Sequence, residues 1–582
     1  MIRALLTCWL IAVASIAHAD LRADLEKIVA DSTLPSLAYA LIEDGKVIQI
    51  DVIGDAPRDA LYRAGSISKS VTTATILSLV EDGVLDLEAS FVEAIPNANL
   101  ANEYPDPIRL VDLLEQTSGL PGTSYADYAN QPTDLPALAV ARSRTLKTRW
   151  APGKFFSYAN VNHTLAAAMA EAATDKTVDA LVAEHVFRPL GMEDATFDRA
   201  EAADRLLQSV DAAGVPQDYW DLEVRPSGAL IGTIDDLAAF ARFIATDDTV
   251  PNRMRTPEAA LVAQQGFPFI YGAGLFAFIE NESVYYGHWG RIDGFQAVLG
   301  TNPAAQSGFV LLTNGADRTA FGQARARIAA AVDGAPLPTI LPSAPFEGDV
   351  EGWWLPFTDD NVKRSWISEI LGLVRINQSN GGLVLSRGVS PWALQRLTQI
   401  NPSSYALPGF PVATHVFATD INGTPYLLGD GQASYRKISS AEAAARIAAL
   451  CAFLATSIVS IVVGLLTLLR RLARPTRPSD AVWLTLSAAA TSALALVALH
   501  VVWGMLSSQY AALATPGPRS LILLGLSLAW PICVAVTFVL ILNRAKRLGW
   551  ITGGFGTLAV ASSTVAIAYL ATFQFVPLIT WL

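Results

Sequence analysis

The stretch "LYRAGSISKSVTTATILSLVEDG", residues 61–83, decides the fold prediction for the front part of this chain. It places Ser66 three residues before Lys69, at the start of a pattern that is otherwise apolar and helical. Residues three apart on a helix are neighbours, so the Ser66 hydroxyl and the Lys69 amine can touch. A drier environment lowers the pKa of a lysine, and the helix dipole favours a developing oxyanion at Ser66. The pattern therefore points to a serine nucleophile with a lysine partner.

A second Ser-x-x-Lys occurs at Ser434 and Lys437, in "ASYRKIS". Its surroundings predict a strand, in which residues three apart point to opposite faces. We therefore interpret this second copy as a decoy.

Other catalytic arrangements have less support in the sequence. The chain has no G-x-S-x-G and no H-E-x-x-H or other zinc spacing, so we expect no metal and no cofactor. A Ser-His-Asp triad stays open, because triads are defined by geometry and not by spacing. Its candidate histidines, outside the first residues and the apolar spans, are His163, His185, His288 and His415.

Composition indicates a membrane protein with an acidic front part. Of the 582 residues, 52% are hydrophobic and 16% are charged, which is too apolar for an ordinary soluble protein. From Arg446 onward there are nine Lys or Arg and one acid, a charge of +8, so the total of −12 leaves −20 for residues 1–445. Such a front part argues against binding to nucleic acid or to an anionic lipid surface.

Four apolar spans are predicted in the last part of the chain, each near the roughly 20 residues that a bilayer requires. They cover about 447–469, 481–505, 520–542 and 555–577. His500 is the one ionisable residue inside them, so we interpret the four spans as an anchor and not as a transport path.

The start of the chain and the basic loops predict the same orientation. "MIRALLTCWLIAVASIAHAD" is typical of a secretory signal peptide, residues 1–19, cleaved after Ala19. By the positive-inside rule, the loops that carry the positive charges are expected on the cytoplasmic side. These charges are Arg470, Arg471, Arg474 and Arg477 in one loop, and Arg544, Lys546 and Arg547 in the other. We expect a multi-pass protein of the bacterial inner membrane, with its front part in the periplasm or exterior.

Four regions are predicted after the signal peptide. Residues 20–335 mix helical patterns with short β-like runs, which predicts an α+β domain. Residues 336–345 form a Pro-rich linker, and residues 346–440 carry short alternating runs with turn signals, typical of a small all-β module. Residues 446–582 form the four-helix transmembrane region.

The front domain resembles the penicillin-recognising serine hydrolases, the branch of class C β-lactamases, D-alanyl-D-alanine carboxypeptidases and D-aminopeptidases (peptidase S12-like). "GSISK" at 65–69 is similar to the family's first motif, which implies that Ser66 is the acylated nucleophile and Lys69 its activating partner. The resemblance implies a β-lactamase/transpeptidase-like fold, and the β module resembles appended lipocalin-like domains. Four further phrases follow in order: "LLEQTSGLPG" (113–122), "WAPGKFFSYANVNH" (150–163), "FRPLGMEDATF" (187–197) and "RPSGALIGTIDDLAAFARF" (225–243).

The family's second motif, Y-x-N, has two candidates here: Tyr128 with Asn130, and Tyr158 with Asn160. Only the second pair follows a lead-in similar to that of the family. The resemblance thus implies that Tyr158 is the general base and that Asn160 orients the substrate amide.

The third motif is similar to "GHWGRIDGF", residues 287–295. The resemblance implies a pocket-lining strand on which the next backbone amide joins that of Ser66 as an oxyanion hole. Trp289 departs from the small or hydroxyl-bearing residue common in the family, which argues against β-lactamase activity. The residues implied are His288, Trp289, Gly290 and Arg291.

These observations predict a membrane-anchored, exported serine hydrolase that cleaves amide or ester bonds through an acyl-enzyme on Ser66. We expect its substrate to be a small molecule or a peptide. Two alternatives stay open: a true class C-type β-lactamase or cell-wall D,D-peptidase, and a catalytically silent binding or sensing module.

Overall fold

The computed structural model describes most of the chain from Asp20 to Thr580. The predicted signal peptide, Asn130 and linker residues 337–345 lie outside the described residues. The described ranges are 20–122, 124–129, 134–246, 248–264, 271–332, 334–336, 346, 348–358, 369, 371–379, 381–387, 390–410, 413–420, 422–429, 434–506 and 513–580.

A seven-stranded sheet forms the centre of the front domain, in the order β13-β10-β11-β12-β1-β2, with β9 also paired to β10. β1 pairs with both β2 and β12, so the start and the end of the domain share one sheet. The continuous apolar runs of β11 and β12 are buried along their whole length, as expected for strands covered on both faces. The strands are β1 (Ser36–Glu43), β2 (Lys46–Gly54), β9 (Phe276–Glu280), β10 (Ser283–Ile292), β11 (Phe295–Asn302), β12 (Ser307–Thr313) and β13 (Ala335–Pro336).

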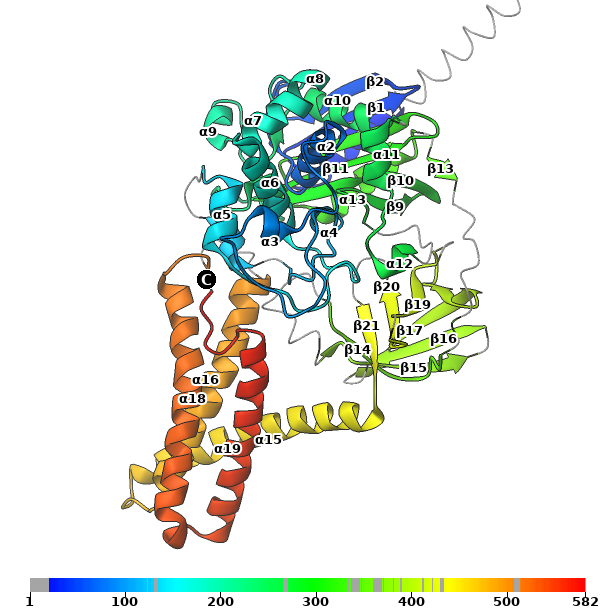
Figure 1. Ribbon diagram of the computed structural model, residues 1–582. Helices are drawn as coiled ribbons and strands as arrows, with labels where there is room; N and C mark the ends of the chain where they lie inside the picture. Colours follow the sequence, from blue (N-terminus) through cyan, green and yellow to red (C-terminus); the bar gives the residue numbers. More distant parts are fainter. Residues whose placement is uncertain are drawn as a thin grey trace, which may run out of the picture.

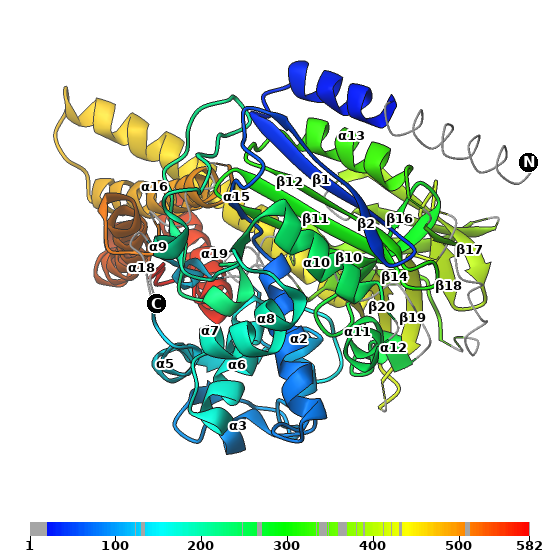
Figure 2. The same ribbon diagram turned by 90° about the horizontal axis from the view of Figure 1, so that it is seen from above.

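Helices cover both faces of this sheet. On one face, α13 (Arg318–Ala329) and the helix over residues 20–30 pack against residues such as Tyr39 and Phe309. The other face carries the larger core, in which α2 (Ile67–Glu81) lies between the sheet and further helices, as Figures 1 and 2 show. Twelve residues of α2 are buried, and half of these are polar. Buried hydroxyls such as those of Ser70 and Thr72 donate to backbone carbonyls, which satisfies them inside the core.

The remaining helices and short strands of this domain complete the helical layer. The helices are α3 (Phe91–Ala94), α4 (Leu110–Leu114), η1 (Tyr125–Asp127), α5 (Ala137–Ser143), α6 (Asn160–Thr174), α7 (Val178–Val182), η2 (Ala183–Phe187), α8 (Arg188–Leu190), α9 (Arg199–Ala202), η3 (Arg225–Ser227), α10 (Ile234–Ile244), α11 (Thr249–Arg255) and α12 (Leu261–Gln264). The short strands are β3 (Tyr62–Arg63), β4 (Asn99–Ala101), β5 (Tyr128–Ala129), β6 (Thr145–Lys147), β7 (Asp221–Leu222) and β8 (Ile231–Gly232). The α+β prediction for this part of the chain is confirmed.

The small β module is a closed barrel of consecutive strands from β14 to β21. Its interior is filled with apolar side chains, among them Trp354 and Phe417, whose ring centroids lie 5.4 Å apart. The strands are β14 (Gly352–Pro356), β15 (Val374–Ser379), β16 (Gly382–Arg387), β17 (Ser390–Asn401), β18 (Ser404–Ala406), β19 (His415–Thr419), β20 (Pro425–Gly429) and β21 (Ser434–Ile438). The prediction of a small all-β module is confirmed.

The second Ser-x-x-Lys falls on strand β21 of this barrel, as the pattern predicted. The Lys437 amine pairs with the Asp349 carboxylate at 2.8 Å, while Ser434 is buried at the other end of the strand. The decoy interpretation is therefore consistent with the barrel geometry.

Four helices of the described residues are long and apolar enough to cross a membrane: Ser440–Arg471, Asp480–Gly504, Pro518–Arg547 and Trp550–Thr572. Within them lie α15 (Ser440–Arg471), α16 (Asp480–His500), η4 (Val501–Leu506), α18 (Pro518–Arg544), η5 (Ala545–Arg547) and α19 (Trp550–Thr572). The last helix ends before the predicted limit at 577, because residues 573–578 fold back onto the bundle. In this tail, Phe575 and Leu578 are fully buried, and the Leu578 amide donates to Ser527 Oγ at 2.9 Å.

α16, α18 and α19 run side by side, whereas α15 crosses them at a steep angle (Figure 1). The Thr456 hydroxyl on α15 lies 2.9 Å from the Ser562 hydroxyl on α19. Gly464, two turns further along α15, packs directly against Ser487 on α16. Small residues at the crossing let the helices approach closely, as is usual between membrane helices.

Candidate active site

Ser66 and Lys69 lie side by side at the first turn of α2. The Lys69 amine is fully buried, and it donates to Ser66 Oγ at 3.1 Å, to Asn160 Oδ1 at 2.8 Å and to the Ser227 carbonyl at 2.7 Å. Burial lowers the pKa of Lys69 to about 7, although the negative charge of Asp127 opposes the shift. A lysine with such a pKa is partly uncharged near neutral pH and can accept a proton.

Two glycines bring β10 into contact with the Ser66 turn. A Cβ on Gly290 would lie 1.9 Å from the Ala64 carbonyl oxygen and 2.8 Å from the Ser66 amide nitrogen. Gly65 has a φ of +54°, and a Cβ there would lie 2.8 Å from the Arg291 amide nitrogen. The amides of Ser66 and Arg291 therefore lie close together at the helix N-terminus, where two donors can meet one oxyanion.

Tyr158 lies next to Lys69, and Tyr128 does not share this position. The Lys69 amine is 4.7 Å from the centroid of the Tyr158 ring. Tyr128 instead packs edge-on against Trp220, with ring centroids 4.8 Å apart. Of the two Y-x-N candidates, the structure brings Tyr158 and Asn160 to Lys69; Asn130 of the other pair is outside the described residues.

Aromatic side chains surround Tyr158. Its ring centroid is 6.1 Å from that of Tyr271 and 6.2 Å from those of Phe276 and His288. Phe276 comes from β9, so the sheet edge and the segment before α6 enclose the tyrosine together. Packing of this kind fixes the orientation of the Tyr158 ring, which stays partly exposed.

His288 lies behind Tyr158, and it is only 1% exposed. Burial, and next the charge of Lys69, lower the pKa of His288 to about 3, so the ring is neutral. Its Nδ1 lies 2.7 Å from the Trp289 carbonyl, which only accepts, so Nδ1 carries the proton. Nε2, 3.2 Å from the Tyr271 hydroxyl, therefore accepts from that group.

The two residues that flank Gly290 differ from His288 in environment. The Trp289 ring stacks on Phe276 at 4.6 Å with an interplanar angle of 10°, and it meets Phe278 at 5.6 Å. Side chains alternate along a strand, so Trp289 faces the side of the sheet opposite to His288. The Arg291 side chain is exposed.

Several residues that support the site were not predicted from the sequence. Gln116 Oε1 accepts from the Ala159 amide at 2.9 Å and from Asn162 Nδ2 at 2.6 Å, so it holds the turn between Tyr158 and α6. The Ser227 hydroxyl donates to the Asn160 carbonyl. Gln116 and Ser227 lie within the family-like stretches 113–122 and 225–243, which could have indicated them. No sequence motif around Tyr271 indicates a role in the site.

His163 belongs to this supporting layer and not to a Ser-His-Asp triad. It is fully buried on α6, and its Nε2 lies 3.1 Å from the Thr73 hydroxyl. Burial lowers its pKa well below the ordinary value, with Lys69 and His288 adding to the shift. A neutral, enclosed ring of this kind fills the core beside α2. In the described part of the chain, no three His, Cys, Asp or Glu side chains form a group that could hold a metal ion.

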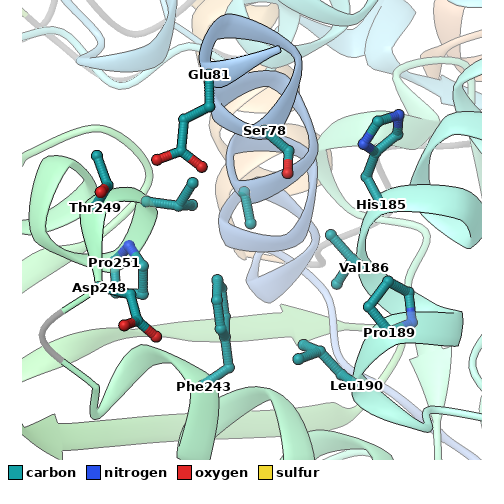
Figure 3. A pocket seen from close by; sticks show the side chains of 12 residues that line it. Ser78, Glu81, His185, Val186, Pro189, Leu190, Phe243, Asp248, Thr249 and Pro251 are labelled. Atoms are coloured by element: carbon teal, nitrogen blue, oxygen red, sulfur yellow. The ribbon is translucent and has the colours of Figure 1, made fainter.

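A cavity of about 480 Å³ lies at the opposite end of α2 (Figure 3). Ser78 and Glu81 of α2, His185 of η2 and Asp248 before α11 point into it. None of the predicted site residues lines this cavity. Because a helix rises about 1.5 Å per residue, it lies roughly 20 Å from Ser66 and is separate from the Ser66 site.

Residues 21–333, about half of the chain, match the model of the Beta-lactamase family, and the chain therefore belongs to this family. It is similar to "Protein flp" of Staphylococcus aureus (strain MW2), 24% identical over 48% of this chain and 60% of that protein. It is also similar to "Penicillin-binding protein 4" of Amycolatopsis lactamdurans, 25% identical over 50% of this chain and 80% of that protein. The chain thus spans less than two thirds of the length of protein flp.

A structural likeness extends beyond the family-matched region. The crystal structure of SurE aligns over 73% of this chain and 99% of its own, with a TM-score of 0.51 and 22% identity. This likeness concerns the fold alone. The predicted β-lactamase/transpeptidase-like fold and the resemblance that implied it are confirmed.

Proposed function

We propose that this protein is a membrane-anchored serine hydrolase that cleaves amide or ester bonds through an acyl-enzyme on Ser66. The proposal rests on one observation above all: a fully buried lysine amine, with a pKa of about 7, lies 3.1 Å from a serine hydroxyl at a helix N-terminus. A structural lysine would be expected to pair with a carboxylate, whereas here the amine donates to three uncharged oxygens.

In the proposed reaction, Ser66 Oγ attacks the carbonyl carbon of the substrate. Its proton passes to the base formed by Tyr158 and Lys69, while the amides of Ser66 and Arg291 stabilise the oxyanion. The C–N or C–O bond then breaks, and the same base returns the proton to the leaving amine or alcohol. For deacylation, the base formed by Tyr158 and Lys69 takes a proton from a water molecule, whose oxygen attacks the acyl carbonyl carbon. The ester bond to Ser66 then breaks, and the proton returns to Ser66 Oγ.

The remaining predicted residues have binding or supporting roles in this proposal. Asn160 is shared between Lys69 and the substrate amide, so it orients both. Gly290 lets the backbone of β10 approach the reacting carbonyl. His288, which is buried, acts through Tyr271 and Tyr158 and not by direct contact with substrate. Phe276 supplies an apolar surface beside Tyr158, and Trp289 stacks on Phe276 from the other side of the sheet.

We place the hydrolase domain in the periplasm or exterior, anchored in the bacterial inner membrane. The signal-like first residues and the arginine-rich loops, 470–477 and 544–547, support this orientation. Four apolar helices of sufficient length are consistent with it.

A β-lactamase or cell-wall D,D-peptidase is the second candidate, and the relative named "Penicillin-binding protein 4" favours it. The residue type at position 289 argues against it, because the family commonly has a hydroxyl-bearing residue there and Trp289 offers no hydroxyl for a substrate carboxylate. A cephalosporin and a D-Ala-D-Ala peptide should be compared with a short-chain p-nitrophenyl ester as kcat/KM ratios.

Ser66→Ala tests the proposal directly. The variant should lose hydrolysis of every ester or amide that the unaltered chain cleaves, while Ser434→Ala should keep it. Full activity in the Ser66 variant would reject the proposal, whereas no hydrolysis at all by the folded, unaltered chain would favour the binding or sensing module.

A further inference from the structure

Residues 149–158 connect the membrane bundle, the β-barrel and the candidate active site. The segment begins with Arg149, whose Nη2 donates to the Thr572 carbonyl of α19 at 3.1 Å. The Arg149 guanidinium also lies 4.7 Å from the centroid of the Phe573 ring. The end of the last membrane helix therefore holds the start of this segment.

The barrel holds the middle of the same segment. The Phe155 ring lies 4.9 Å from Phe357 and 4.8 Å from Tyr426 on β20, measured between centroids. Trp150 adds a further contact with Phe357 at 6.4 Å. Trp150 and Phe155 are only 6% and 5% exposed, so the barrel surface covers both rings.

The next residues turn toward the candidate active site. Phe156 lies 5.9 Å from Tyr271 and 6.3 Å from Phe276, the rings that also enclose Tyr158. Phe155 and Phe156 are adjacent in the chain, so one peptide bond connects the ring that the barrel holds to a ring that packs against Tyr271 and Phe276.

The barrel and the bundle also contact each other close to this segment. Glu369, in the barrel region, lies 3.4 Å from the Tyr569 hydroxyl of α19 and 3.6 Å from Arg446 of α15. Tyr569 in turn packs against Phe573, the ring that Arg149 covers. Figure 1 shows the front domain above both the bundle and the barrel, as these contacts require.

We infer that the barrel and the bundle position the catalytic tyrosine, with Phe155 and Arg149 as the positioning residues. This inference rests on the proposed function of Tyr158. A base must lie within hydrogen-bond reach of the proton it accepts, and a misplacement of about 1 Å can cost roughly 100-fold in rate. The four helices and the barrel then have a role in turnover besides anchoring.

The test uses the full-length chain in detergent, with an ester substrate. Phe155→Ala, and Tyr426→Ala on the barrel side of the same contact, should each lower kcat by about 10–100-fold with little change in KM. Phe155→Leu should restore part of kcat. Leu394→Ala is the matched barrel control, because Leu394 is 57% exposed, and its kcat should equal that of the unaltered chain.

Arg149→Gln is the milder variant on the bundle side. It removes no aromatic ring from a packed cluster, so we expect the domain to stay folded. It should also lower kcat. Unchanged kcat in Arg149→Gln, Phe155→Ala and Tyr426→Ala, with all three folded, would overturn the inference.

A double-mutant cycle separates positioning from general damage. If Phe155 acts through Tyr158, Phe155→Ala should have little further effect on kcat in the Tyr158→Phe background. Equal losses in both backgrounds would overturn the inference and leave the proposed function intact. Failure of the proposed function is recognised separately, because the unaltered chain would then neither hydrolyse esters nor be labelled at Ser66 by a fluorophosphonate.

Discussion

The Lys69 amine lies 3.1 Å from the Ser66 hydroxyl oxygen and is shut off from solvent. The same amine binds Asn160 of the second motif and the Ser227 carbonyl, so three separate parts of the chain meet at one nitrogen. Burial gives this amine a pKa of about 7, far below the ordinary value of a lysine.

The first prediction concerns pH. Lys69 must be uncharged to accept a proton, and its pKa is about 7. Acylation should therefore rise with pH up to about 7, close to tenfold per unit, and level off above it. Labelling rates with a neutral phosphonate between pH 5 and 9 measure this directly.

A Lys69→Met variant is the control, since it keeps the bulk and removes the base. It should label slowly and without this pH dependence. A flat profile in the unaltered chain would contradict the role given to Lys69.

The second prediction separates the two candidate tyrosines. Because Tyr158 packs against the Lys69 amine, Tyr158→Phe should lower kcat by roughly 10²–10⁴, the range for a positioned acid–base group. Tyr128→Phe should have little effect, because Tyr128 packs against Trp220. The opposite ranking in steady-state kinetics would show that the wrong pair was chosen.

The third prediction concerns the contact between β10 and the Ser66 turn. Gly290→Ala places a Cβ 1.9 Å from the Ala64 carbonyl oxygen, so backbone must move and the two amides must separate. We expect loss of activity together with a lower melting temperature. Gly322→Ala on α13 is the control, since its Cβ meets nothing within 4 Å. It should keep activity and gain roughly 0.5–1 kcal/mol of stability, as helical alanines do.

The fourth prediction concerns orientation in the membrane. Protease added to intact spheroplasts should remove the region of residues 20–440, because the basic loops are expected on the cytoplasmic side. A tag inserted between Arg471 and Arg477 should stay protected. A protected hydrolase domain with an accessible tag would reverse the proposed topology.

The first motif and α2 could be predicted because their signals are local. Ser66 and Lys69 are one turn apart, and the apolar run after them defines a buried helix. The barrel could also be predicted as a β module, since most of its strands are joined by connections of only a few residues.

Contacts between distant segments could not be predicted in the same way. Tyr271 meets His288, and Phe276 meets Trp289, only because β9 pairs with β10 at the sheet edge. Residues 573–578 fold back because they pack against other helices of the bundle. A hydropathy pattern cannot predict such packing, so the predicted span extended too far. The junction at Arg149 joins two parts of the chain that lie 423 residues apart.

The most direct test of the central claim is the site of covalent labelling. The full-length chain is treated with a fluorophosphonate in detergent, digested, and analysed by mass spectrometry. We predict one adduct, on Ser66, which is absent in Ser66→Ala and greatly slowed in Lys69→Met. An adduct on another serine, Ser434 included, or no adduct on a folded chain that hydrolyses esters, would contradict the account.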